Sequence, residues 1–134
     1  MFTPDHEKAA TELMRVCKPG GKIGLANWTP DGFIGQLFKT IGKYLPPPAG
    51  VKSPALWGTS ARINELFGLQ ASSIKVESRH FVFRYRSPQH WLDIFKTYYG
   101  PVLKAFASLQ PSAQAELTGD ITALIDRFNR SGDG

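Results

Sequence analysis

Residues 13–28, LMRVCKPGGKIGLANW, decide the fold that the sequence predicts. Before Pro19 the apolar residues follow the period of an amphipathic helix, and after Gly21 residues 22–28 form an apolar run typical of a buried strand. A Pro-Gly-Gly turn joins the two. A helix that leads through a tight turn into a strand covered on both faces is one half of a parallel α/β unit. The sequence therefore predicts an α/β fold.

Helix-start signals recur along the chain, each a Ser, Thr or Pro followed by apolar residues at helical spacing. Thr3 is the predicted cap of the first helix, whose buried face would include Val16, and His6 in its first turn is expected at the surface. Further helices are expected to begin at four places: after Pro30, at Thr59 or Ser60, after Ser87 and at Pro111. Residues 46–58 are expected to form a loop or lid, and residues 87–130 a C-terminal helical segment.

Residues 73–86 are the second predicted strand. Their apolar residues alternate in two phases, and the slip between the phases predicts a bulge near residues 78–80. Two strands alone are marginal in water, and an apolar strand edge without a neighbour is an aggregation hazard. We therefore expect that the chain is a piece of a larger domain or that it completes its sheet with a second copy of itself.

The composition narrows the function classes. The 134 residues suffice for one domain, 42% of them are apolar and 20% are charged, and no apolar run reaches the roughly 18 residues of a membrane span. The single cysteine, Cys17, and the lack of a secretory leader pattern predict a cytoplasmic protein. The net charge of +5 is scattered, and Arg79, Arg84 and Arg86 form its densest group. A solvated surface is the prediction, with nucleic acid not expected as a partner.

The order helix, K-P-G-G, apolar strand, N-W-T-P, helix carries a family resemblance. RVCKPGGKIGLANW resembles the segment around the fifth strand of class I S-adenosylmethionine-dependent methyltransferases of the ubiquinone/menaquinone-biosynthesis-like (type 11) group. MFTPDHEKAATELMRV is similar to the segment after that family's fourth strand, and WGTSARINELFG and FVFRYRSPQHWLDIFKTYYGP are similar to its C-terminal region. The resemblance covers the chain from Met1 to about Arg130.

The resemblance implies a Rossmann-like methyltransferase sheet, of which this chain would be the C-terminal part. Residues 22–28 would be strand five and residues 73–85 strand six. Strands one to four would precede Met1, and the last strand would follow Gly134. Residues 1–134 would then be a single partial domain.

The family holds S-adenosylmethionine with a glycine-rich loop after strand one and an acidic residue after strand two. Neither element is in this sequence, and Gly20-Gly21-x-x-Gly24 precedes its predicted strand, whereas a cofactor loop follows one. S-adenosylmethionine is therefore the cofactor that the intact family implies, and no cofactor is expected on this chain alone.

A substrate pocket is implied near the carboxyl end of the fifth strand, where ligands of open α/β sheets bind. Its candidate residues are Phe2, Asn27, Trp28 and Phe33, although Trp28 fits equally well as a residue that packs against the following helix start. No catalytic residue is expected, because methyl transfer chiefly requires alignment of the reactants. No metal site is expected either, because His80 and His90 have no partner at metal-ligand spacing.

The predicted function is a fragment of a methyltransferase that acts on an unidentified small-molecule acceptor and is inactive alone. The alternative is a non-enzymatic, self-associating α/β interaction module. The expected partner is accordingly a second copy or a missing N-terminal half, without nucleic acid or a membrane.

Overall fold

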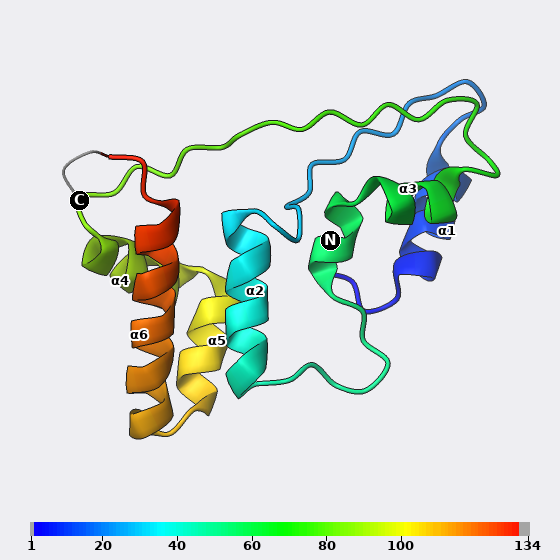
Figure 1. The fold of residues 1–134 in the computed structure, drawn as a ribbon. Coiled ribbons are helices and arrows are strands. Elements are labelled where there is room, and N and C mark those ends of the chain that lie inside the picture. Colours follow the sequence, from blue (N-terminus) through cyan, green and yellow to red (C-terminus); the bar gives the residue numbers. More distant parts are fainter. Residues whose placement is uncertain (1, 132–134) are drawn as a thin grey trace. The chain divides into compact units, whose positions relative to one another are not determined.

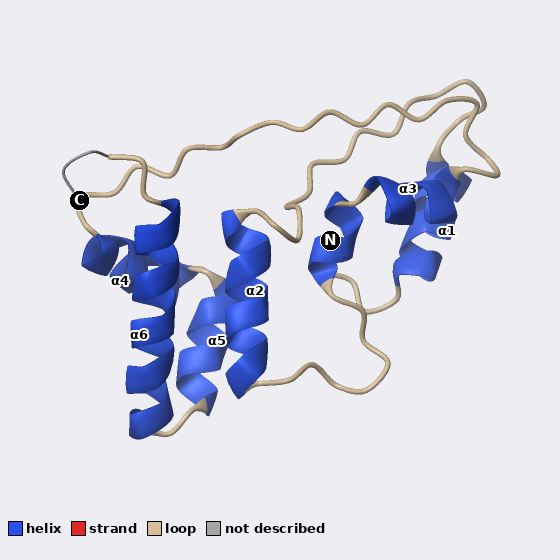
Figure 2. Ribbon diagram, viewed as in Figure 1, coloured by secondary structure: helices blue, strands red, loops and turns tan. Residues whose placement is uncertain are grey.

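The computed structural model describes residues 2–131, and its regular structure is helical (Figure 1). In chain order the elements are α1 His6–Val16, α2 Phe33–Tyr44, the 3-10 helix η1 Pro54–Gly58, α3 Ser60–Phe67, α4 Pro88–Tyr98, α5 Gly100–Ser108 and α6 Pro111–Phe128. No described residue lies in a strand or bridge, and Figure 2 accordingly shows helices and loops alone. The predicted α/β fold, part of a Rossmann-like sheet, is therefore wrong for the described chain.

The two predicted strands are loops in the structure. Residues 22–28, here named the N-segment, and residues 73–85, the C-segment, lie outside helix and strand throughout. An apolar run becomes a strand only where a neighbouring backbone exchanges hydrogen bonds with it. Neither segment has a strand neighbour among residues 2–131, and Leu25, predicted to be buried, is 43% exposed. The bulge predicted near residues 78–80 is wrong for the same reason, since a bulge requires a strand ladder.

The chain folds as two compact units. Unit 1 comprises Met1–Gly32 and Pro47–Arg79, and unit 2 comprises Phe33–Pro46 and His80–Gly134. Two of the boundaries coincide with features of the sequence. One lies within the proline run that begins at Pro46, and another lies at the slip in apolar phase near residues 78–80. The slip thus marks the passage of the C-segment from one unit to the other.

Unit 1 packs α1 and η1 against α3. Its core consists of Ala10, Trp57 and Phe67, with partly buried residues around it that include Ile23 of the N-segment and Ile74 of the C-segment. Val16, predicted on the buried face of α1, is 64% exposed, because the buried stripe of this helix runs through His6 and Ala10.

Unit 2 is a bundle of four helices in which α2 packs on α6, and α4 on both α5 and α6 (Figure 1). Leu37 of α2 and Leu117 and Ile121 of α6 are completely buried. Phe33 begins α2 and joins three other parts of the unit through its ring, at centroid distances of 5.8 Å to Phe83, 5.3 Å to Trp91 and 5.6 Å to Phe128.

Most predicted helix starts are confirmed. Thr59 caps α3 by accepting a hydrogen bond from the Arg62 amide, and Ser87 caps α4. The helix predicted at Pro111 is α6. The first cap is a correction, because Asp5 caps α1 and Thr3 does not.

Candidate functional site

The first turn of α1 carries a cluster of polar side chains that hydrogen-bond to one another and to neighbouring elements. The Asp5 carboxylate accepts a hydrogen bond from the Lys8 amide at 2.8 Å, which is the geometry of an N-cap, and the Thr3 hydroxyl donates to the Asp5 carbonyl oxygen at 3.2 Å. This cap fixes the direction in which α1 begins. In that first turn the His6 side chain faces η1. The Glu7 side chain faces α3 and the loop before η1.

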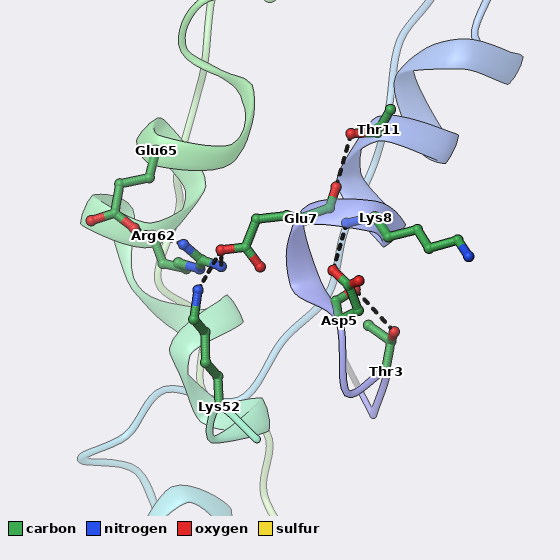
Figure 3. A network of polar contacts seen from close by, with 8 residues as sticks. All are labelled: Thr3, Asp5, Glu7, Lys8, Thr11, Lys52, Arg62 and Glu65. Carbon is green, nitrogen blue, oxygen red and sulfur yellow. Dashed lines mark hydrogen bonds and ion pairs between the residues drawn. The ribbon is translucent and has the colours of Figure 1, made fainter. Parts of the chain in front are cut away.

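Glu7 is the hub of an ion-pair network (Figure 3). Its Oε1 accepts hydrogen bonds from Nη2 of Arg62, at 2.7 Å, and from Nζ of Lys52. Arg62 reaches Glu65 through its other terminal nitrogen, at 2.9 Å. The hydrogen bonds from Lys52 and then from Arg62 lower the pKa of Glu7 to about 2. The network ties α1 to α3 and to the loop that precedes η1.

Arg62 differs from Lys52, the other cation of the network, because it is buried, with 9% of the residue exposed. Its two carboxylate partners raise its pKa, so it stays charged. The Nε atom of Arg62 has no hydrogen-bond partner. Removing either carboxylate would leave more of this buried charge without compensation, which is costly in a protein interior.

His6 is fully buried at 0% exposure, so its predicted surface position is wrong. Its ring packs on Trp57 of η1, with the centroids 5.3 Å apart and the planes tilted by 55°. Neither ring nitrogen of His6 has a hydrogen-bond partner. The indole nitrogen of Trp57 has none either. Burial lowers the pKa of His6 below its ordinary value of 6.5, and the positive charge of Arg62 lowers it further. The imidazole is therefore neutral at pH 7.

This cluster contains ion pairs and a buried imidazole. None of its side chains is a serine or cysteine nucleophile. Among residues 2–131 no group of three or more His, Cys, Asp or Glu side chains is placed to hold a metal ion. Cys17 is the C-cap of α1 and is partly exposed. Within the same described range, no helix has the length and apolar character that crossing a membrane would require.

The structure divides the predicted pocket residues between the two units. Phe2, at 57% exposed, and the partly buried Asn27 and Trp28 belong to unit 1. Phe33 belongs to unit 2, where its ring packs in the aromatic core. The pocket itself stays a prediction.

Sequence reasoning missed the burial of His6 and Arg62. A signal was present for His6, since it stands four residues before the buried Ala10 and thus on the same helix face. No comparable local signal exists for Arg62, whose partner Glu7 lies 55 positions earlier in the sequence.

Comparison with known proteins finds mycobacterial relatives. The chain is 41% identical over 132 residues to the proteins named Uncharacterized protein Rv1403c of Mycobacterium tuberculosis (strain ATCC 25618 / H37Rv) and Uncharacterized protein Mb1438c of Mycobacterium bovis, covering 96% of this chain and 48% of each relative. It is 38% identical over 136 residues to Uncharacterized protein Rv1405c of M. tuberculosis, covering 98% of this chain and 50% of that protein. The chain thus spans about half the length of the curated relatives it matches. No protein-family model matches the sequence, and no solved structure is significantly similar to it.

Proposed function

We propose that this chain works as one part of a longer S-adenosylmethionine-dependent methyltransferase of the cytoplasm, and that it transfers no methyl group unless further polypeptide covers its N-segment and C-segment. The observation that carries the proposal is the exposure of apolar side chains along both segments. Leu25 is 43% exposed, Val76 53% and Val82 57%. The roughly twofold length of the relatives supplies a candidate for the covering polypeptide.

Exposed apolar residues that stand singly on a surface need no explanation, whereas a continuous apolar patch indicates an interaction. In the part of the C-segment that belongs to unit 2, two successive apolar residues are exposed, Phe81 at 67% and Val82 at 57%. The Phe83 ring faces the core, 5.9 Å from Phe95, while the neighbouring Val82 and Arg84 are exposed. Residues 81–85 also line a shallow hollow of about 240 Å³. One side of this stretch is thus seated on helices and the other is open to a partner.

The resemblance of the K-P-G-G region to methyltransferases supports the chemical part of the proposal. Methyl transfer from a sulfonium depends mainly on aligning the acceptor, the methyl group and the leaving sulfur. A chain can therefore contribute to the reaction by shaping the acceptor side, with Phe2, Asn27 and Trp28 of unit 1 as candidate residues. The small-molecule acceptor follows from the resemblance, and the cytoplasmic location from the single cysteine.

We expect the isolated chain to show no saturable binding of S-adenosylmethionine by titration calorimetry, since it lacks the glycine-rich loop and the ribose-binding carboxylate. Co-expression with the part of Rv1403c that lies outside the matched 132 residues should yield a complex that binds the cofactor. A dissociation constant below about 100 μM for the isolated chain, roughly −5.5 kcal/mol, would contradict the proposal. So would a complex in which the amides of the N-segment and C-segment exchange as fast as in the free chain.

A second candidate function is self-association without catalysis, in which the two segments are covered by another copy of the chain. The same exposed side chains favour it. Sedimentation at micromolar concentration distinguishes self-association from the role as one part of a longer methyltransferase. A defined dimer that Leu25→Asp converts to monomer, while Lys22→Asp leaves it intact, supports self-association, and a stable monomer excludes it.

A further inference from the structure

We propose that His6 is an acid-sensitive latch: protonation of its buried ring releases α1 from η1 and α3 and opens unit 1. The proposal is independent of the methyltransferase function, because it concerns residues that the acceptor pocket does not use. It rests on three features of the described chain, namely the complete burial of His6, the lack of hydrogen-bond partners at both ring nitrogens, and the packing of the ring on Trp57.

A neutral imidazole carries one N–H donor and one acceptor nitrogen, whereas the protonated ring carries two donors and a positive charge. Inside unit 1 the second donor would find no acceptor, because neither nitrogen of His6 is within hydrogen-bond reach of one. Burying a charged group without an acceptor is far more costly than burying a neutral one. Protonation of His6 therefore opposes its burial.

Within residues 2–131, the charged side chains that act on the His6 pKa lie on α3, on α1 and on the loop before η1. Arg62 of α3 and Lys52 of the loop before η1 oppose a second positive charge, and Glu7 of α1 itself favours it. Glu7 is, however, already shared between Lys52 and Arg62. Residues 54–58 of η1, the element whose Trp57 packs on the ring, contain no titratable side chain. The net effect of burial and charge disfavours the imidazolium.

The direction of the pH dependence follows from the lowered pKa of His6. The opened form binds a proton at the ordinary value of 6.5, and the closed form binds it only at lower pH. Opening therefore becomes easier as the pH falls below 6.5, by up to about tenfold per pH unit until the pKa of the closed form is reached. The pKa of Glu7 is about 2 in the closed form and 4.5 ordinarily. Protonation of Glu7 therefore favours opening mainly below pH 4.5.

The experiment is hydrogen exchange of the complete chain at pH 7.5, 6.5, 5.5 and 5.0, corrected for the intrinsic effect of pH on exchange. We expect the amides of α1 to open up to about tenfold more per unit below pH 6.5, and the helices of unit 2 to show no such slope. The variant His6→Gln, which cannot be protonated, should lose the slope in α1. His80→Gln, which removes an exposed histidine, should retain it.

A second measurement does not depend on a variant that folds. The ring C–H protons of His6 in the wild-type chain should titrate below pH 6.5 in NMR spectra, together with the signals of Trp57. A titration of His6 at or above 6.5 would overturn the proposal. An α1 slope that persists unchanged in a folded His6→Gln variant would also overturn it, as would an α1 without any slope in the wild-type chain.

Discussion

Replacing Ile121 by Ala should lower the free energy of unfolding of unit 2 by about 2–5 kcal/mol. Ile121 is 0% exposed in the middle of α6, the helix that packs on α2. The smaller side chain loses the favourable transfer of the removed atoms from water, and it leaves a cavity that the surrounding helices fill only in part. Two further residues of this helix pair, Leu37 and Leu117, are equally buried, so the cavity would lie in the interior.

The measurement is denaturant unfolding followed by helical circular dichroism, with hydrogen exchange of α2 and α6 to assign the loss to unit 2. Leu103→Ala is the matched control, because Leu103 of α5 is 40% exposed and its truncation leaves no closed cavity. The control should change the stability by about 0.5 kcal/mol or less. Equal effects of the two substitutions would show that α6 is not packed on α2 in solution.

The helices were predictable because their signals are local. Ser87 precedes Pro88 in the sequence and caps α4 in the structure, and Pro111 opens α6 as its fixed backbone angle favours. A cap or a first-turn proline acts within four residues of itself, so the sequence alone carries the information. For α1 the local rule does not select a single cap, since Thr3 and Asp5 both satisfy it and the cap is Asp5, two residues after the predicted Thr3.

The apolar runs were not sufficient to predict a sheet. A segment forms a strand only when a second segment pairs with its backbone through hydrogen bonds. Residues 22–28 show the composition of a strand, but the hydrogen-bonding neighbour that would make them one is not in the described chain. The polar network of the candidate site could not be predicted from the sequence for a similar reason. The pairing of Glu7 with Arg62 joins two helices across 55 positions, and nothing in either neighbourhood of the sequence indicates the other. Only the stripe of His6 and Ala10 carried a local sign of burial.

Gly58 is another non-local feature, and Gly58→Ala should destabilise unit 1 by about 3 kcal/mol. The added methyl group would lie well inside van der Waals distance of the Trp28 carbonyl oxygen, 2.6 Å from the carbonyl carbon and 2.8 Å from Cα of Thr29. These are backbone atoms, so no side-chain rotation relieves the overlap. The backbone angle φ of Gly58 is not positive, and the whole cost is therefore steric. Either η1 or residues 28–29 must move, which disturbs Trp57 and with it the core of unit 1.

Gly42→Ala is the matched substitution, because a methyl group at Gly42 meets nothing within 4 Å. Gly42 lies inside α2, where Ala is favoured over Gly by roughly 0.5–1 kcal/mol. The two glycine-to-alanine changes should therefore have opposite signs, the first accelerating hydrogen exchange in α1 and α3 and the second slowing it in α2. If Gly58→Ala leaves the exchange of α1 and α3 unchanged, η1 does not approach residues 28–29 in solution.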